Sequence, residues 1–444
     1  MAAASTPANL AHLYRRAAFG TDRGAIDAAA ADGIEATVDL LLAAPADVPG
    51  DPPAPVFEEL DESLRGRGRD LSEDEQLELQ RERQRIYREG FQDLVTWWIG
   101  MMATSPQPQV EKTTFILHDH FATGIEKVKV AEAMYNQNLA LRAWAFGSFP
   151  DLVQTIAKDP AMIFWLDLQS STADNLNENF GRELLELFTL GAGNYSQEDV
   201  REVSRAFTGW TLVGRTQSQF RARRHDSGEK TVLGETGTFD GEDIVALVTS
   251  RRESAEWIAA EFWSKLAYPD PEAAVVTRLA DAYEAGGRRI DALLRAIYTD
   301  DAFYSPAALN GLVKTPVEFF VGALRAFGLG VETEDPHPQR LLVAMRAMGQ
   351  EPFQPPNVAG WSQNRYWTNT AMAQVRFEIA GAIAEIAPEA ELPEPGSADA
   401  VDALIDRLGL VDPPIEYREA LAGFDGEPRG LVQLALAAPT YQMN

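Results

Sequence analysis

Residues 177–191 have the sequence NENFGRELLELFTLG and lie at the centre of a strongly helical region, residues 159–210. Successive side chains on a helix are about 100° apart, so the apolar side chains here cover more than half of the circumference. They are Phe180, Leu184, Leu185, Leu187 and Phe188. A helix that is apolar over so much of its surface is usually buried deep in a protein. We therefore predict a core helix that starts near Asn175, with Glu178 completing a partial capping box, and that ends before Gly191.

A narrow polar stripe runs along the same predicted helix. It consists of Glu178, Arg182, Glu186 and Thr189, the first three spaced four residues apart, and Glu183 lies at its border. Side chains at this spacing commonly form ion pairs on an exposed helix face. Alternatively, because the rest of the helix is apolar, the stripe lines an internal polar site. The spacing favours the ion-paired face, and the second interpretation stays open.

Helix start signals flank this segment and recur along the chain. Asp159 precedes Pro160, a pair that is typical of an N-cap and the first helical position. Thr315-Pro316-Val317-Glu318 combines an N-cap threonine, a proline and a glutamate at the third helical position, which together predict a capping box. The sequence therefore predicts a mainly α protein, a multi-helix globular bundle with a small loop and β-hairpin insertion.

The predicted organisation is a single large helical domain, residues 1–444. A proline-rich loop at about 44–56 and a loop-rich insertion at about 211–240 interrupt the helices, and we expect Lys230–Leu233 to form a small hairpin. Residues 386–444 are acidic, contain several prolines and should form a C-terminal helical subregion. A long helix after Ser72 is charged up to Arg88 and apolar beyond it, so its first half should project into solvent.

Charge and composition exclude several classes of protein. The chain has 39 basic and 67 acidic side chains, a net charge of −28, which repels nucleic acid and anionic membranes. The absence of cysteine excludes disulfides and thiolate chemistry. No segment approaches the roughly 20 apolar residues of a transmembrane helix, so we predict no transmembrane segment. The N-terminus lacks a basic region followed by an apolar one, which favours a cytoplasmic location.

The common motifs of serine hydrolases, zinc proteases and nucleotide-binding loops are absent. Among the segments that remain, His118-Asp119-His120 is the most suggestive of chemistry. On a strand the two histidines would share a face and could chelate one divalent metal. The surrounding pattern predicts a helix, on which they lie about 160° apart, so joint ligation requires the helix to unravel here. Hydrogen-bonded core histidines are the alternative that the spacing favours.

Other segments give weaker signals. Residues 167–178 have the length of an EF-hand loop but lack its central glycine and one acidic ligand, so we expect a connecting loop rather than a calcium site. His225-Asp226 lies in the loop-rich insertion, where functional residues often occur, and a solvated turn is the alternative explanation. Trp210, Trp361 and Trp367 offer surfaces for stacking a flat ligand, although core packing is their commoner role.

These features together resemble a bacterial family known as domain of unknown function 1800 (DUF1800), over nearly the whole chain. The resemblance rests on eight segments: His12–Gly20, His118–Phe121, Lys158–Met162, Asn177–Gly191, Ala206–Trp210, His225-Asp226, Lys314–Glu318 and Pro355–Trp361. It implies fold and kinship rather than a particular reaction. Members often accompany a second protein, of domain of unknown function 1501, that resembles sulfatases and alkaline phosphatases. The resemblance therefore implies such a partner, which often carries an export signal, so export with the partner stays open.

Polar members of these segments make up the predicted site: His118, His120, Glu178, Arg182, Glu183, His225, Asp226 and Lys314. Polar groups in apolar helices are costly unless paired, so their convergence would create a pocket with acid–base groups. One hypothesis is a hydrolytic enzyme. Glu178 or Glu183 would be its general base or metal ligand, the histidines its acid–base groups, and Arg182 its anion-binding residue. His118, His120 and Glu178 are the candidate ligands of a divalent metal. The other hypothesis is a non-catalytic partner or scaffold for the sulfatase-like protein, in which the same residues form a structural network.

Overall fold

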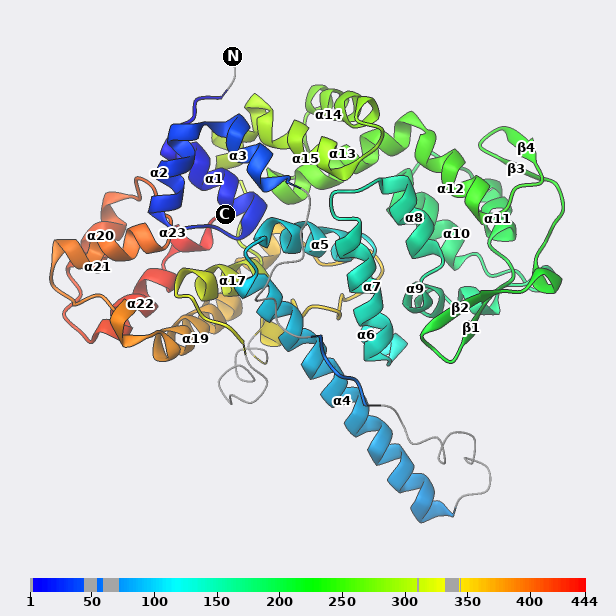
Figure 1. Ribbon diagram of the computed structural model, residues 1–444, viewed down its shortest axis with the longest axis horizontal. Helices are drawn as coiled ribbons and strands as arrows, with labels where there is room; N and C mark the ends of the chain where they lie inside the picture. Colours follow the sequence, from blue (N-terminus) through cyan, green and yellow to red (C-terminus); the bar gives the residue numbers. More distant parts are fainter. Residues whose placement is uncertain (1–2, 44–53, 59–71, 310, 332–342, 344) are drawn as a thin grey trace.

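The computed structural model describes residues 3–43, 54–58, 72–309, 311–331, 343 and 345–444, and it is mainly helical (Figure 1). Within these residues, the strands form two short two-stranded sheets. The predicted fold class, a mainly α protein with a small hairpin insertion, is confirmed. Most of the predicted proline-rich loop, residues 44–53, lies outside the described residues, and residues 54–56 have no regular structure.

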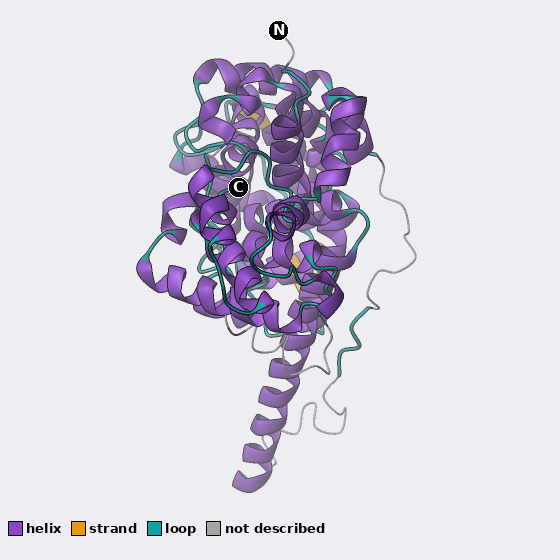
Figure 2. Ribbon diagram, turned by 90° about the vertical axis from the view of Figure 1, so that its left-hand side faces the viewer, coloured by secondary structure: helices purple, strands orange, loops and turns teal. Residues whose placement is uncertain are grey.

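The N-terminal part contains three short helices and one long one: α1 (Pro7–Ala18), α2 (Arg23–Asp32), α3 (Ile34–Leu41) and α4 (Glu73–Thr104). A capping box of Ser72 and Glu75 starts α4, whose 32 residues span about 48 Å at 1.5 Å per residue. Apart from Leu79, its buried residues begin at Phe91. Figures 1 and 2 show the preceding half projecting from the body of the protein, as its charge pattern predicts.

The central part begins with a run of short helices: α5 (Pro108–His120), α6 (Ile125–Val128), α7 (Ala131–Ala143), α8 (Phe149–Ala157), α9 (Pro160–Trp165), η2 (Leu168–Ser170), α10 (Asn179–Glu183) and α11 (Gln197–Ala206). Asp159 caps α9 as expected, because its carboxylate accepts the N–H of Met162 at 2.9 Å. The segment 167–178 is an irregular connection that contains only the single turn η2.

A π-helix, η3 (Leu184–Thr189), continues α10 and shifts the side chains away from the predicted helical wheel. In a π-helix each N–H bonds to the carbonyl five residues back, as Leu190 does to Leu185 at 2.9 Å. The predicted start at Asn175 was wrong: α10 begins at Asn179, because Asn175 forms a tight turn with Thr172. The buried apolar character of the segment agrees with the prediction, but Thr189 of the predicted polar stripe is buried and donates its hydroxyl to the carbonyl oxygen of Leu184.

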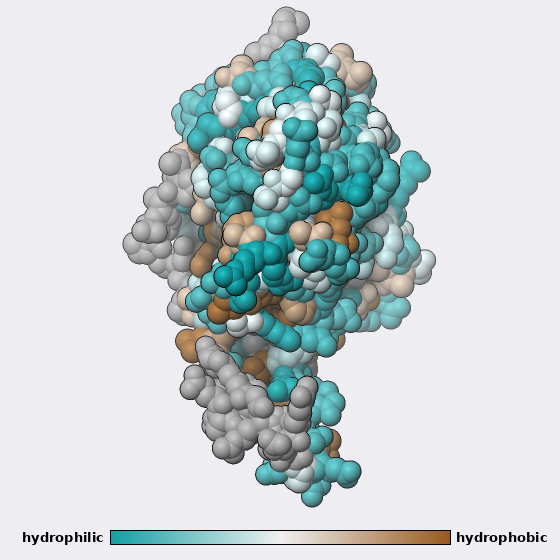
Figure 3. All heavy atoms as spheres, turned by 90° about the vertical axis from the view of Figure 1, so that its right-hand side faces the viewer, coloured by the Kyte–Doolittle hydropathy of each residue, from teal (hydrophilic) through white to brown (hydrophobic). Residues whose placement is uncertain are grey.

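The insertion folds into two hairpins. β1 (Trp210–Val213) pairs antiparallel with β2 (Gln217–Phe220), and β3 (Lys230–Val232) pairs antiparallel with β4 (Glu235–Gly237). The second is the hairpin that the sequence predicts at Lys230–Leu233. Its turn residues, Leu233 and Gly234, both have positive φ, which suits a two-residue turn between twisted strands. Both hairpins lie on the right-hand side of Figure 1, and Figure 3 shows that this face of the molecule is largely hydrophilic.

The described residues after the insertion contain these helices: α12 (Gly241–Ser250), α13 (Arg252–Leu266), α14 (Ala273–Ala285), α15 (Ile290–Thr299), η5 (Asp301–Tyr304), α16 (Pro306–Leu309), α17 (Pro316–Ala326), η6 (Asn364–Trp367), α19 (Thr370–Ile386), η7 (Glu389–Glu391), α20 (Ala398–Arg407), α21 (Ile415–Ala422), α22 (Pro428–Ala437) and α23 (Pro439–Gln442). Thr315 and Glu318 form the expected capping box at the start of α17. The helices α20 to α23 lie within residues 386–444.

Two clusters of buried apolar residues form the core, and α5 contributes to both. Ile116 and Leu117 belong to the cluster that includes α1, α8 and α13, whereas Phe115 belongs to the cluster that includes α4, α17, α19 and α22. The N-terminal and C-terminal regions are in contact through α2 and α20. The single-domain organisation over residues 1–444 stays a prediction. None of the helices in the described ranges is both long enough and apolar enough to cross a membrane.

Candidate functional site

The two histidines of the 118–120 triplet point into different apolar clusters. Rings of one cluster surround His118: Trp98, Phe353 and Trp361. Rings of the other surround His120: Phe121, Phe149 and Phe188. Because α5 stays helical up to His120, the two imidazoles cannot turn toward one ion.

Both histidines are buried and hydrogen-bonded. The backbone N–H of Phe353 donates to Nε2 of His118 at 3.1 Å, so this nitrogen carries no proton. Nε2 of His120 lies 3.0 Å from the carbonyl oxygen of Phe188, which only accepts, so this nitrogen carries the proton. Burial lowers the pKa of His118 to about 3 and that of His120 to about 4. Both are therefore neutral near pH 7.

Glu178, Arg182 and Glu183 lie on a partly exposed helix surface. The guanidinium of Arg182 is 3.4 Å from Glu178 and donates to Gln197 at 3.0 Å, and Gln197 donates to Glu178 at 2.8 Å. Glu186 leaves this ladder and accepts the hydroxyl of Tyr195 at 2.6 Å. Burial, and then the charge of Glu186, raise the pKa of Glu183.

The candidate metal ligands do not fit a shared ion. His118 and His120 point into separate clusters, and Glu178 bonds to Arg182 and Gln197 on the surface. Across the residues that the structure describes, no group of three or more histidine, aspartate and glutamate side chains could hold a metal.

Asp226 holds together the base of the second hairpin. Its carboxylate accepts two hydrogen bonds from Arg205, at 2.7 and 3.1 Å, and this guanidinium lowers its pKa to about 2. His225 lies with Nδ1 3.0 Å from the carbonyl oxygen of Thr208. The buried amine of Lys230 donates to the carbonyl of Asp226 at 2.7 Å. These polar groups therefore form contacts that stabilise the loop.

The structure therefore does not bring the eight predicted residues into one pocket. The two histidines occupy separate cores, three residues lie on the surface of α10 or just before it, and His225 and Asp226 lie at the base of a hairpin. The eighth, Lys314, lines a substantial pocket.

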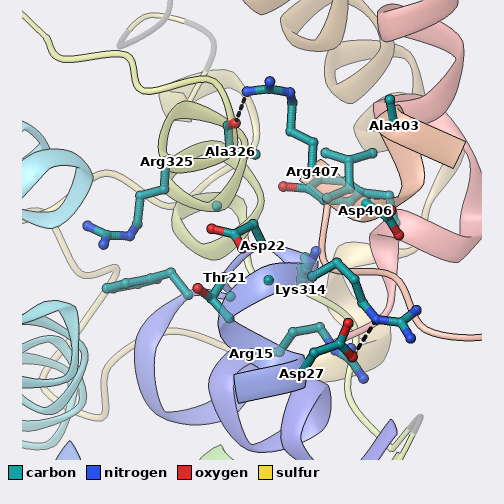
Figure 4. A pocket seen from close by; sticks show the side chains of 17 residues that line it. Arg15, Thr21, Asp22, Asp27, Lys314, Arg325, Ala326, Ala403, Asp406 and Arg407 are labelled. Carbon is teal, nitrogen blue, oxygen red and sulfur yellow. Dashed lines mark hydrogen bonds and ion pairs between the residues drawn. The ribbon is translucent and has the colours of Figure 1, made fainter. Parts of the chain in front are cut away.

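This pocket has a volume of about 660 Å³, within the usual range of small-molecule sites (Figure 4). It lies between the two ends of the chain, where α1 and α2 meet α17, α20 and α23. Its lining includes five cations: Arg15, Arg23, Lys314, Arg325 and Arg407. Its acidic members are solvent-exposed, so water and salt screen their charges: Asp22, Asp27 and Asp406.

Three of these cations have protein partners. Arg23 and Arg407 are ion-paired, and Arg325 donates to carbonyl oxygens at the end of α4. Arg15 and Lys314 differ, because neither side chain forms a hydrogen bond or ion pair with any residue of the described chain. In Figure 4 these two lie in the middle of the view, with Arg325 on one side.

Backbone contacts on both sides hold Lys314 in place. The N–H of Lys314 donates to the carbonyl oxygen of Gln442 at 2.8 Å, and the guanidinium of Arg376 donates to the carbonyl oxygen of Lys314 at 2.6 Å. The residue is 3% exposed, and its Nζ lies 3.4 Å from the centre of the Tyr441 ring. Burial, followed by the charge of Arg15, holds the pKa of Lys314 well below its ordinary value.

Lys314 belongs to a buried group of cations around Glu318. Glu318 pairs with Lys112 through one carboxylate oxygen and caps the first turn of α17 through the other. It favours the charged form of Lys314, whereas Arg15, Arg376 and Lys112 oppose it. Buried like charges are destabilising unless a negative group compensates them. Lys314 thus places the pocket next to a group of buried cations, and both oxygens of the one carboxylate among them, Glu318, already have a partner.

Residues 12–443 match the model of a family described as Protein of unknown function (DUF1800). The chain belongs to this family. The resemblance identified from the sequence is thereby confirmed. No curated protein and no solved structure matches the chain. Two of the segments that carry the resemblance to DUF1800, His12–Gly20 and Lys314–Glu318, meet at the pocket.

Sequence reasoning on this DUF1800 chain missed Arg15 and Tyr441 as site residues. A signal for Arg15 was present, since Arg15-Arg16 is a charged pair on a helix whose residues on either side, Leu13 and Ala17, are buried. Nothing in the sequence links Tyr441 to the other two residues, because α23 reaches the pocket only through the tertiary fold.

Proposed function

We propose that this DUF1800 protein binds a small anion, a carboxylate or a phosphate, in the pocket lined by Arg15 and Lys314. The supporting observation is that both side chains line the pocket and that neither forms a hydrogen bond or an ion pair with a described residue. Lys314 is 3% exposed, so bulk water contributes little to stabilising its charge. An anion would supply the partner, and the guanidinium of Arg15 offers paired donors that suit carboxylate and phosphate oxygens.

Anion binding at Lys314 should take up protons. The groups that face its amine are Arg15 of α1, Lys112 of α5, Glu318 of α17, Arg376 of α19 and Tyr441 of α23. They and the burial of the amine leave its pKa lowered in the free protein, and a bound anion would raise this pKa by stabilising the ammonium. By linkage, the affinity falls as pH rises from the free-state pKa to the bound-state pKa.

Isothermal titration calorimetry with inorganic phosphate and with pyruvate tests the proposal. We expect binding that weakens as pH rises and that falls at least about tenfold in Arg15→Gln, because a hydrogen bond to a charged group contributes about 1.5–3 kcal/mol. Arg295→Gln is the matched control, since Arg295 is a partly exposed arginine paired with Asp39 outside the pocket. If neither anion binds the folded protein, or if Arg15→Gln binds like wild type, the proposal fails.

Hydrolysis is a second proposal, and Glu183 carries it. This half-buried carboxylate directly precedes a π-helix, a feature common at functional sites, and its raised pKa suits a general base. Turnover of nitrophenyl esters, phosphates or sulfates that is lost in Glu183→Gln at an unchanged melting temperature would support it. Co-purification with a sulfatase-like protein, without turnover by the isolated chain, would support the scaffold alternative.

A further inference from the structure

We infer that Lys314 forms a covalent imine with a small ligand that carries both an anionic group and an aldehyde or ketone carbonyl. This inference rests on the proposed function, because Arg15 would hold the anionic group. It deepens that proposal by naming the class of ligand, oxo acids and phosphorylated carbonyl compounds, and by giving the lysine a chemical role.

The position of Lys314 suits such a role. Its side chain lines a pocket of about 660 Å³, and its amine is held against the ring of Tyr441 rather than in an ion pair. Two other lysines provide the comparison. Lys112 and Lys265 are also largely enclosed, yet each is ion-paired with a carboxylate, Glu318 or Asp119. Among these three lysines, Lys314 is the one whose amine the described carboxylates leave free to react.

The electrostatic surroundings favour the reactive form of the amine. Only an unprotonated amine attacks a carbonyl, and an ordinary lysine, with a pKa near 10.4, is almost fully protonated at pH 7. Burial and the charge of Arg15 lower the pKa of Lys314, and Lys112 and Arg376 act in the same direction. Desolvation next to other cations is a general way to activate a lysine for imine formation. Arg15 would therefore have two roles: in the free protein its charge helps to keep the amine unprotonated, and on binding it would hold the anionic group of the ligand.

The step balances without an added oxidant or reductant. The lone pair on Nζ forms a bond to the carbonyl carbon, and the carbonyl π electrons move to oxygen, which takes up a proton. The nitrogen gives up its first proton to complete the carbinolamine. The hydroxyl group then takes up a proton and leaves as water, the nitrogen gives up its second proton, and a carbon–nitrogen double bond remains. One lysine and one carbonyl compound give one imine and one water molecule.

Reductive trapping on the wild-type protein tests the inference. The full chain is incubated with pyruvate at about pH 7, where ordinary lysines are protonated. Sodium borohydride is then added, and the lysine-containing peptides are analysed by mass spectrometry. We expect Lys314 to gain the mass of pyruvate less one oxygen, and Lys112 and Lys265 to stay unmodified. Labelling should decrease when inorganic phosphate is present in excess, and it should be reduced at least about tenfold in Arg15→Gln, in line with the loss of one charge-assisted hydrogen bond.

The outcomes separate this inference from the anion-binding proposal. If pyruvate binds in calorimetry but Lys314 is not labelled, imine formation is excluded while anion binding stands. If exposed lysines such as Lys129 are labelled as fast as Lys314, the reaction is non-specific and the inference is overturned. If neither binding nor labelling occurs, both proposals fail. Lys314→Arg adds a further check, because it keeps a cation for phosphate binding and cannot form the adduct.

Discussion

Nε2 of His120 donates a hydrogen bond of 3.0 Å to the carbonyl oxygen of Phe188, and this bond joins α5 to the end of the π-helix η3. The last carbonyls of a helix have no partner within the helix. Here His120 satisfies the carbonyl of Phe188, and the indole of Trp257 satisfies that of Leu187 at 2.9 Å. Two side chains from distant segments thus cap the end of the most distinctive segment of the sequence.

We expect His120→Leu to destabilise the fold by about 1–3 kcal/mol, because the buried carbonyl of Phe188 would lose its donor. Urea denaturation of the wild type and the variant measures the difference. His120→Gln offers an amide donor in the same direction and should lose less. Equal stability of the Leu variant and the wild type would show that the bond is of no structural importance.

His118 should make the protein sensitive to acid. Its pKa is about 3 in the folded protein and about 6.5 in an unfolded chain, so the unfolded state binds the proton first as pH falls. Its contribution to stability is present above about pH 6.5 and is lost progressively toward pH 3. His118→Gln keeps an acceptor for the N–H of Phe353 but does not titrate. Its free energy of unfolding should depend less steeply on pH than that of the wild type, and parallel curves would contradict this assignment.

Glu183→Gln should leave the melting temperature at pH 7 unchanged or slightly raised. A carboxylate whose pKa is raised by burial and by Glu186 makes the folded state less favourable as pH rises past its ordinary value near 4.3. The amide removes that penalty. Glu178→Gln is the control on the same surface, where the exposed pair with Arg182 should contribute less than about 1 kcal/mol. A clear drop in the melting temperature of Glu183→Gln would assign Glu183 a structural role instead.

The sequence predicts helices and caps well where the signal is local. Thr315 and Glu318 form a complete capping box because both partners lie within one turn of each other. The wheel for residues 177–191 finds the buried face, but it cannot anticipate the π-helix, since the groups that satisfy its last carbonyls, His120 and Trp257, lie far away in the chain. For the same reason the eight candidate residues share motifs without sharing a pocket. The order of the motifs is a property of the sequence alone. Whether their side chains meet in one pocket depends on how the helices pack.

Asp226→Asn should weaken the second hairpin. Its carboxylate receives two hydrogen bonds from Arg205, and charge-assisted pairs of this kind contribute roughly 2 kcal/mol when partly buried. Hydrogen exchange of the β3–β4 amides should accelerate in the variant. Because the pKa of Asp226 is lowered to about 2, this stabilisation is present above about pH 4 and is lost as pH falls toward 2. Glu198→Gln, which removes an exposed pair with Arg201, should leave these amides unchanged.

Lys314→Met should raise the stability of the free protein near neutral pH. Its lowered pKa means that the unfolded chain binds the proton more readily, so the wild type gains stability as pH rises from the folded-state pKa to about 10.4. Methionine has a similar shape and carries no charge, so this part of the pH dependence should disappear. Thermal unfolding at several pH values measures it, with Lys127→Met as an exposed control. A less stable Met variant would indicate that the contact with Tyr441 outweighs the cost of burial.

The pocket between the two ends of the chain also has a consequence for biosynthesis. A ribosome makes about 5–20 residues per second, so Tyr441 emerges roughly 20–90 s after Arg15. Until α20 and α23 arrive, the pocket lacks the part of its wall that these two helices form. A nascent chain or a proteolytic fragment that lacks the last helices therefore has an incomplete site for the proposed anion. Occupancy of this pocket would report on the integrity of the whole chain, and a ligand that binds there would protect both ends from unravelling together.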